Sequence, residues 1–369
     1  MEKNSIKATC RGPINIALIK YWGKEDEENI IPLNNSISLT LDKSEFFTET
    51  CVELYQNNLR TIRLILNGEE QEISKRVMKL IDFFRSKCDD EKFANGELLI
   101  KSFNSFPTAA GCASSASSMS CLVKVLSKVF LKDSLSDIEL SKLARQGSGS
   151  ACRSVLGGFV EWYKFNEDYK DSVAVQICNE NHWRNLNVLL VIVSDKRKDT
   201  SSTDGMRVSK ETSELLRCRV ENIVPKRLKQ MREAIQIKDF DSLCELTIKD
   251  SNNFHAVCRD TFPTICYLND TSNFIIKCVE RINNHYGKWI CAYTFDAGPN
   301  AFLLVENENC EAIVNYLNFI FSEDSDASEK IKNYDSTLVN LLNEMRIYRI
   351  SIAANIKQIK QFEIGSGVE

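Results

Sequence analysis

The chain has 369 residues, of which 43% are hydrophobic and 27% are charged, and its formal net charge is −4. This composition is typical of a globular protein, and the length is sufficient for two domains that share a cleft. The slightly acidic balance gives no general positive field, so we expect neither a nucleic-acid partner nor a membrane partner. The first residues lack the apolar core of a secretion signal, and no apolar run is long enough to span a bilayer.

Fourteen cysteines stand singly along the chain, and no two of them form a Cys-x-x-Cys pair. Since there is no secretion signal, we expect most of them to be reduced and packed in the core. The three histidines, His182, His255 and His285, are far apart and do not have the spacing of metal ligands. The sequence therefore predicts no zinc site, and we assign no residue as a metal ligand.

The first third of the chain is rich in predicted strands. Apolar runs at 14–18 and 37–41 predict two strands, and the segment Pro-Leu-Asn-Asn at 32–35 has turn chemistry. Residues 64–68 predict a strand that ends in a turn. Apolar residues at helical spacing predict a helix over 77–84.

A loop of small residues follows at 107–118, with the sequence Pro-Thr-Ala-Ala-Gly-Cys-Ala-Ser-Ser-Ala-Ser-Ser. Apolar positions at helical spacing after it predict a helix over about 119–129. A helix start of this kind offers unpaired N–H groups and suits an anion, whereas its serines could equally be ordinary helix caps. No lysine stands in the slot of a Gly-x-x-x-x-Gly-Lys-Ser/Thr loop, so a nucleotide would require a different fold.

The later elements alternate between helix and strand. We expect a helix at 136–146, which Gly147 ends, and a buried strand at 186–193. A helical pattern runs from 209 to about 250, where Pro225 marks a break or a new helix start. Another helix is expected at 272–286, and paired strands at 289–295 and 301–305. We place a domain boundary near residue 195, which gives two domains in an α+β or mixed α/β arrangement.

Four further segments could carry chemistry. Lysines flank two aromatic residues in Lys-Tyr-Trp-Gly-Lys at 20–24 and could bind phosphate, or they could be solvated beside core aromatics. The small-residue segment 147–153 delivers Arg153, which could grip an anion or lie on the surface. Hydroxyls cluster at 199–206, either as a ligand site or as a capped helix start. Asp296 precedes a Gly-Pro turn, where it could shape the turn or orient a hydroxyl group.

Together these segments resemble the mevalonate diphosphate decarboxylase family, which belongs to the GHMP kinase superfamily. The resemblance covers nearly the whole chain. The Pro-x-x-x-Gly loop marks only the superfamily, whereas the Lys-Tyr-Trp-Gly-Lys and Phe-Asp-Ala-Gly-Pro-Asn runs mark the decarboxylases. The resemblance implies an α+β fold with a ribosomal-protein-like domain at 1–195, a ferredoxin-like domain at 196–369, and a cleft between them.

The resemblance also implies an activity. Members of this family use ATP and Mg²⁺ to convert (R)-mevalonate 5-diphosphate to isopentenyl diphosphate, ADP, phosphate and CO₂, in isoprenoid and sterol biosynthesis. It further implies a cytoplasmic homodimer. Two alternatives stay open, namely a sibling kinase that stops after phosphorylating the hydroxyl, and a non-catalytic binding protein built on the same fold.

Site residues are carried over by their positions in the family motifs. The catalytic residues implied are Asp296, Arg153 and Lys20. The substrate-binding residues implied are Tyr21, Trp22, Gly23, Lys24, Arg76, Ser148, Gly149, Ser150, Ala151, Cys152, Arg153 and Thr203. The nucleotide-binding residues implied are Pro107, Gly111, Ser114, Ser115 and Ser117. Two residues depart from the family pattern, since Cys112 stands where leucine is common and Leu33 where threonine or methionine is usual.

Overall fold

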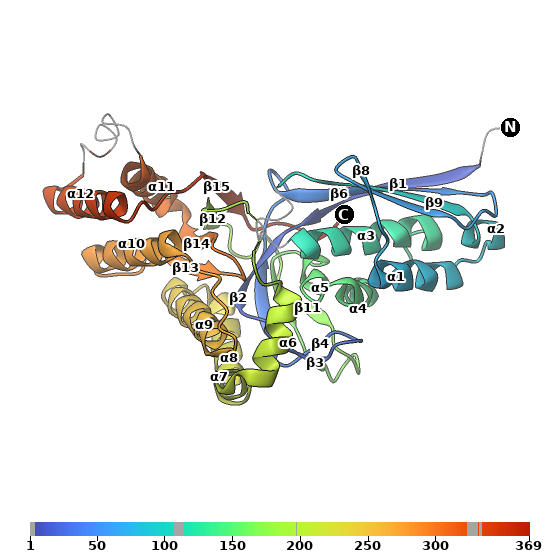
Figure 1. Cartoon of the computed structure of the whole chain (residues 1–369), viewed down its shortest axis with the longest axis horizontal. Coiled ribbons are helices and arrows are strands. Elements are labelled where there is room, and N and C mark those ends of the chain that lie inside the picture. The colour runs from blue at the N-terminus through green and yellow to red at the C-terminus, as the bar shows by residue number, and fades with distance from the viewer. Residues whose placement is uncertain (1–3, 107–113, 197, 323–330, 332–333) are drawn as a thin grey trace.

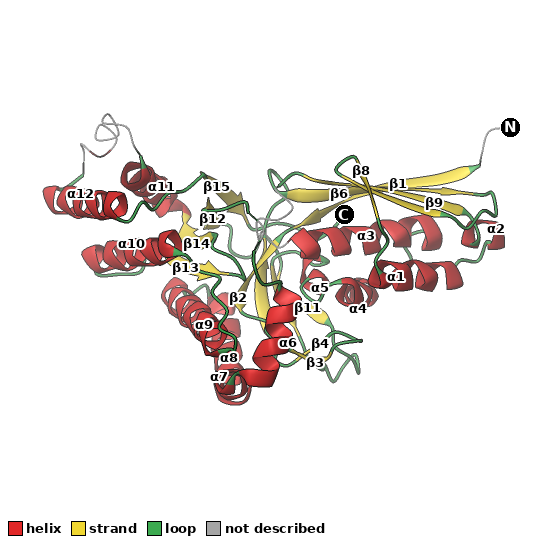
Figure 2. Cartoon of the chain, viewed as in Figure 1, coloured by secondary structure: helices red, strands yellow, loops and turns green. Residues whose placement is uncertain are grey.

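A computed structural model describes residues 4–106, 114–196, 198–322, 331 and 334–369. The molecule is elongated, with a sheet and its helices from the first part of the chain at one end (Figure 1). Helices from the last third of the chain form the opposite end, and strands lie between the two ends (Figure 2). Within the described part of the chain, no helix combines the length and apolarity needed to cross a membrane.

The sheet at the N-terminal end has five strands in the order β1-β6-β9-β7-β8. Their pairing is antiparallel except for β7 and β9, which are parallel. Residues of β6 alternate between half-buried and buried, because α1 and α3 cover only one face of this sheet. The elements are β1 (Ser5–Pro13), β6 (Phe47–Tyr55), β7 (Ile62–Leu66), β8 (Glu69–Gln71), α1 (Lys75–Ser86), α2 (Glu91–Ala94), β9 (Glu97–Asn104) and α3 (Ser114–Leu131).

A second sheet, in the order β11-β10-β5-β2, lies in the middle of the molecule. Strands β2 and β5 are buried at every position, since α5 packs on this sheet from one side and helices α8 and α9 pack against β2. The elements are β2 (Asn15–Ile19), β3 (Lys24–Asp26), β4 (Ile31–Pro32), β5 (Ser36–Thr40), α4 (Asp137–Gly147), α5 (Ala151–Ser154), β10 (Phe159–Trp162) and β11 (Ala174–Cys178). Strands β3 and β4 form a separate small ribbon.

A third sheet, in the order β13-β14-β12-β15, carries the C-terminal end. Its core includes Phe295, Leu303 and Tyr316, packed between the strands and helices α10 to α12. The elements are β12 (Leu186–Ile192), α6 (Ser202–Thr212), α7 (Glu214–Cys218), a π-helical turn (Arg219–Ile223), α8 (Val224–Ile237), α9 (Phe240–Asp260), α10 (Asp270–Tyr286), β13 (Ala292–Phe295), β14 (Ala301–Glu306), α11 (Asn307–Phe321), α12 (Ser336–Ser351) and β15 (Gln358–Glu363).

Most predicted elements are confirmed, with shifted ends. The helix expected at 136–146 is α4, and Ser136 and Glu139 form a capping box at its start. The helical region expected from 209 begins earlier, at Ser202, because Ser201 caps α6. The strand expected at 289–295 starts only at Ala292. Helix α8 begins at Val224 with Pro225 in its first turn, so of the two alternatives for Pro225 the new helix start is confirmed. A π-helical turn directly precedes this start.

The C-terminal segment returns to the N-terminal half of the molecule. After β15, Ile364 pairs with Leu41, and the N–H of Gly365 donates to the carbonyl of Thr40 at 2.9 Å. Glu369 exchanges two backbone hydrogen bonds with Arg11. The residues after Glu363 therefore pack with the first half of the chain, and the boundary at residue 195 stays a prediction.

Candidate active site

A cavity of about 930 Å³ is lined by residues from both halves of the chain. The end of β2, the α4–α5 connection, the start of α6 and the β13–β14 turn meet there. Twelve of the residues implied by the family resemblance line it: Lys20, Tyr21, Trp22, Lys24, Arg76, Ser115, Ser148, Gly149, Ser150, Arg153, Thr203 and Asp296. Folding therefore gathers most of the predicted site into one space.

An ion pair between Lys20 and Asp296 lies at the wall of this cavity. Strand β2 ends at Ile19, so Lys20 is the first residue beyond the buried strand, and its Nζ lies 2.8 Å from Asp296 Oδ1. The Lys20 side chain is 3% exposed, whereas that of Asp296 is 29% exposed. Burial lowers the pKa of Lys20, and the carboxylate of Asp296 opposes this shift. Asp296 thus faces the cavity with a buried ammonium group behind it.

The turn that carries Asp296 is fixed at both ends. The N–H of Phe295 donates to Ser251 Oγ at 3.1 Å before the turn. After it, Asn300 Oδ1 accepts hydrogen bonds from the N–H groups of Val193 and Ser194 at 2.8 and 3.0 Å. These contacts anchor the turn to α9 and to the end of β12, so the Asp296 carboxylate has a defined position.

Arg153 is a buried cation with neutral partners. Its Nη1 donates to Ser36 Oγ at 2.9 Å and its Nη2 to Asn15 Oδ1 at 3.3 Å, while its Nε has no hydrogen-bond partner among the described residues. The residue is 3% exposed, and burial lowers its pKa. Within the described ranges, no carboxylate lies within 4.0 Å of the guanidinium group. Such a group favours an anionic ligand, because an unpaired buried charge is costly.

Tyr21 and Trp22 line the cavity and pack in the core, but the alternative of solvated lysines in their motif is wrong, because Lys20 and Lys24 are each 2% exposed. Tyr21 packs edge-on against Trp162 at 4.6 Å between ring centroids. Its hydroxyl group is buried and has no hydrogen-bond partner in the part of the chain that the structure describes. Trp22 donates from Nε1 to Ser209 Oγ at 2.9 Å and packs against Phe254.

The two small-residue segments meet at the cavity. Ser148 Oγ donates to Ser115 Oγ at 3.1 Å, which joins the start of α3 to the end of α4. Arg76, in the first turn of α1, is half-buried and lines the same cavity. Lys24 is buried, and its Nζ donates to Glu27 Oε2 at 2.6 Å. Cationic and hydroxyl groups therefore converge on one region.

Four residues implied by the resemblance are absent from the described cavity lining, namely Gly23, Ala151, Cys152 and Ser117. The backbone of Gly23 has φ +88°, and a Cβ there would lie 2.5 Å from Leu33 Cδ1, so this position requires glycine. Ala151 is fully buried in the core. Cys152 is also fully buried, its thiol donates to the carbonyl of Gly149, and burial raises its pKa to about 12.

Ser117 occupies a packing position rather than the cavity wall. Its hydroxyl donates to the carbonyl of Gly12 at 2.6 Å and accepts from the N–H of Thr48 at 3.0 Å. The residue is fully buried, so its side chain ties α3 to β1 and β6. Pro107, Gly111 and Cys112 lie outside the described residues. Ser114 is described only as the first residue of α3.

Lys198 is a cavity residue that the motif analysis missed. Its Nζ donates to Ser202 Oγ at 2.7 Å and to the carbonyl of Ala297 at 3.2 Å. Burial lowers its pKa, and the charge of Asp296 opposes this shift. The sequence offered only a basic run near the predicted boundary as a signal. The other lining residues outside the predicted set are Asn15, Ala17, Asp199, Ser201, Ser202, Asp204, Met206, Phe254 and Ala297.

The charge of the cavity favours a polyanionic ligand. Its described lining contains five cationic side chains but only three carboxylates. No group of three or more His, Cys, Asp or Glu side chains among the described residues could hold a metal ion.

Comparisons with known proteins agree over the whole chain. The Diphosphomevalonate decarboxylase-like N-terminal domain matches residues 12–174, and the Mevalonate 5-diphosphate decarboxylase C-terminal domain matches residues 188–369. The chain is 40% identical to Diphosphomevalonate decarboxylase of Bos taurus over 380 residues, which covers 99% of this chain and 94% of the relative.

Solved structures agree with this match. The mevalonate diphosphate decarboxylase from Trypanosoma brucei superimposes with a TM-score of 0.85 at 37% identity, over 99% of this chain and 97% of the other. The structure described as MDDEF in complex with MVAPP, AMPPCP and magnesium gives a TM-score of 0.78 at 35% identity, over 99% of each chain. The expected α+β fold is confirmed, and the chain belongs to the mevalonate 5-diphosphate decarboxylase family.

Proposed function

We propose that this protein catalyses the ATP-dependent decarboxylation of mevalonate 5-diphosphate to isopentenyl diphosphate, ADP, phosphate and CO₂. The observation that carries the proposal is the Lys20–Asp296 ion pair, which faces a cavity rich in cationic side chains. The substrate bears a diphosphate and a carboxylate, and such a cavity is complementary to both groups. Asp296, Lys20 and Arg153 are the catalytic residues of this proposal.

The cavity also suits ATP and Mg²⁺. The hydroxyl of Tyr21 and the Nε of Arg153 are buried polar groups without partners among the described residues, as expected where a polar ligand completes the site. Bound ATP supplies the phosphoryl group that turns a poor leaving group into a good one, and Mg²⁺ neutralises its phosphates. Magnesium usually keeps several waters and binds through phosphate oxygens, which agrees with a cavity that has no protein cage for it among the described residues. The comparison structure that holds MVAPP, AMPPCP and magnesium supports this assignment.

Asp296 orients the tertiary 3-hydroxyl of the substrate in this mechanism. A carboxylate is too weak a base to ionise a free tertiary alcohol, so Asp296 accepts the proton late, as the new P–O bond forms. The ammonium of Lys20, 2.8 Å from Asp296 Oδ1, holds the carboxylate in place. Once Asp296 has passed this proton to water, its carboxylate is negative again and stabilises the positive charge that develops at C3 when phosphate leaves.

Arg153 binds the anionic groups of the substrate. Its guanidinium has fixed neutral partners in Ser36 and Asn15, so it can hold an anion without breaking an internal ion pair. The electron pair of the breaking carbon–carbon bond forms the new double bond, and the carboxylate leaves as CO₂. Binding the substrate in one orientation aligns that bond with the departing phosphate.

The remaining family expectations belong to the same proposal. We propose a cytoplasmic homodimer, with Tyr21, Trp22, Lys24, Arg76 and Thr203 contacting the substrate. The nucleotide contacts the segment 107–118, of which Ser115 lies in the described cavity lining. Size-exclusion chromatography with light scattering tests the dimer, since the molar mass measured for a monomer would be about half that of the dimer.

The deciding experiment measures two products together. ADP and CO₂ are quantified from purified protein with ATP, Mg²⁺ and mevalonate 5-diphosphate, beside an Asp296→Ala variant. Equal amounts of both products, lost in the variant, are the expected result. ADP without CO₂ would identify a kinase that stops at phosphorylation. If neither ADP nor CO₂ forms, the protein is instead the non-catalytic binding protein of the second alternative.

A further inference from the structure

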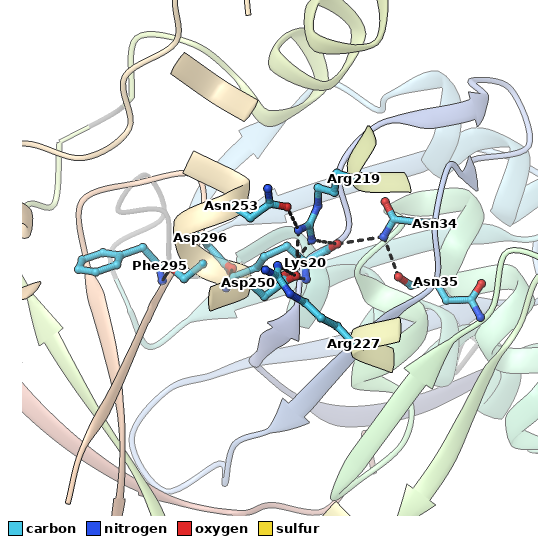
Figure 3. Close-up of polar contacts among 10 residues, drawn as sticks. Lys20, Asn34, Asn35, Arg219, Arg227, Asp250, Asn253, Phe295 and Asp296 are labelled. Atoms are coloured by element: carbon cyan, nitrogen blue, oxygen red, sulfur yellow. Dashed lines mark hydrogen bonds and ion pairs between the residues drawn. The ribbon is translucent and has the colours of Figure 1, made fainter. Parts of the chain in front are cut away.

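Two fully buried charged side chains, Asp250 and Arg219, hydrogen-bond the backbone of Lys20 from outside the cavity. The N–H of Lys20 donates to Asp250 Oδ2 at 2.7 Å, and Arg219 Nη2 donates to the carbonyl of Lys20 at 3.1 Å. Arg219 and Asp250 also form two mutual hydrogen bonds of 2.8 Å each (Figure 3). One bidentate ion pair therefore binds both backbone polar groups of a single residue.

Neighbouring side chains complete this cluster. Asn34 Nδ2 donates to the same carbonyl of Lys20 at 3.1 Å, and Arg219 Nη1 donates to Asn253 Oδ1 at 2.6 Å. Arg227 reaches Asp250 Oδ1 at 3.0 Å but does not contact the Lys20 backbone. The contacts to the Lys20 backbone come from three separate parts of the chain, at Asn34, Arg219 and Asp250 (Figure 3).

Stability alone does not explain the cluster. Both side chains of the Arg219–Asp250 pair are 0% exposed, and removing two charges from water costs several kcal/mol per ion. A pair of well-packed apolar residues is often at least as stabilising. What an apolar pair cannot do is hydrogen-bond both the N–H and the carbonyl of Lys20 and so fix this backbone in one orientation.

The turn that carries Arg219 is specialised. Arg219–Ile223 is a π-helical turn, in which the N–H of Val224 bonds to the carbonyl of Arg219. Pro225 follows directly and has no N–H to continue the α-helical pattern. Turns of this kind are rare and often occur at functional sites. Here the widened turn delivers a buried arginine to the end of β2.

We propose that Asp250 and Arg219 are positioning residues, which fix the backbone of Lys20 so that its ammonium group stays on Asp296. Neither residue is part of the described cavity lining, so they act on the reaction through Lys20. The inference rests on the proposed function, because it assigns the pair to the same reaction. It predicts that disturbing the pair affects the chemical step more than substrate binding.

The charges around Lys20 give this proposal a second readout. Those that face its side chain or backbone are Asp296 from the β13–β14 turn, Asp250 and His255 from α9, Arg153 from α5, and Arg219 from the π-helical turn. Burial lowers the pKa of the Lys20 ammonium, whereas the charges of Asp296 and Asp250 raise it. Removing the charge of Asp250 should therefore lower the pKa of Lys20 further.

Asp250→Asn tests the proposal because it removes the charge at nearly constant volume. We expect kcat to fall about 10- to 100-fold, the effect of a small misplacement of a reacting group. KM for ATP and for mevalonate 5-diphosphate should change less than about threefold, since no substrate contact is lost. The alkaline limb of the kcat–pH profile should move to lower pH.

A matched control separates positioning from a general loss of packing. Glu161 is also a fully buried carboxylate bound twice by an arginine, at 2.9 and 2.8 Å from Arg232 Nη1. It has no contact with Lys20 among the described interactions, so Glu161→Gln should lower the thermal midpoint without a change in kcat or in the alkaline limb. If Asp250→Asn does not fold, Asn34→Ala provides a milder loss of one hydrogen bond to the Lys20 carbonyl.

A measurement independent of turnover completes the test. The ammonium of Lys20 can be titrated by ¹⁵N NMR in the wild type and in Asp250→Asn, with Lys20→Arg to assign the signal. A lower pKa in Asp250→Asn supports the proposal. An unchanged pKa, or an unchanged kcat in an active wild type, overturns it. A wild type without decarboxylase activity would instead overturn the proposed function, and the NMR titration would still decide the positioning effect.

Discussion

Replacing Arg153 by methionine should separate stability from activity. The guanidinium donates to Ser36 and Asn15 in the unliganded protein, and hydrogen bonds from a charged donor contribute about 1.5–3 kcal/mol each. Removing the buried charge also removes its desolvation penalty, which is several kcal/mol. Since the two effects are similar in size and opposite in sign, we expect Arg153→Met to change the free energy of unfolding by less than about 2 kcal/mol. At about 2.1 cal/mol/K of unfolding entropy per residue over 369 residues, this corresponds to less than about 3 °C in Tm.

Activity should respond much more strongly. If the guanidinium makes two hydrogen bonds to an anionic group of the substrate, the variant loses about 3–6 kcal/mol of binding. At about 1.4 kcal/mol per factor of ten, kcat/KM for mevalonate 5-diphosphate should fall roughly 10²- to 10⁴-fold. Steady-state kinetics with the coupled release of ADP and CO₂ measures this fall, and differential scanning calorimetry measures Tm.

Arg145→Met is the matched control. Arg145 is similarly buried, but it donates to the carbonyl of Asn29 and is paired with Asp171, and it lies outside the described cavity lining. We expect this variant to lower Tm and to leave kcat/KM unchanged. A value of kcat/KM within tenfold of the wild type in Arg153→Met would refute the reasoning. A fall in Tm well beyond about 3 °C would show that the guanidinium is chiefly structural.

Burial lowers the pKa of Lys20 below its usual 10.5, so kcat should be lost as the pH rises through that lowered value and the ammonium deprotonates. In Lys20→Arg the guanidinium stays charged at high pH, so any activity of this variant should lack the alkaline limb. An unchanged alkaline limb in the variant would show that another group causes the limb. A Cβ at Gly149 would lie 2.8 Å from Trp162 Cη2 and 3.1 Å from Tyr21 Oη, so Gly149→Ala should cost about 1–3 kcal/mol in chemical denaturation and raise KM. A wild-type stability in chemical denaturation and a wild-type KM in Gly149→Ala would contradict this expected clash. Deletion of residues 364–369 removes the backbone bonds that join the tail to β1 and β5 and should lower the denaturation midpoint, whereas an unchanged midpoint would show that the tail is dispensable.

The sequence by itself determined the local elements, and its motifs led to the proposal of the principal site residues. The acidic residues Asp137 and Glu139 and the glycine at 147 predict α4, because the signals that start and end a helix lie only a few positions apart. The motifs around Lys20, Arg153 and Asp296 are also short runs, so their residues could be proposed from the order of amino acids alone. The family fold followed from the same runs.

Burial and long-range pairing required the tertiary structure. Lys20 and Asp296 are 276 residues apart in the chain, and no local pattern predicts their 2.8 Å contact. The sequence also did not show that Ser117 is a packing residue, that Lys198 enters the cavity, or that Asp250 grips the backbone of Lys20. Whether a polar side chain faces a ligand, a backbone group or the core depends on which distant segments fold against it. The short motifs and the family resemblance therefore proposed residues such as Lys20 and Asp296, and only the folded arrangement decided what each one contacts.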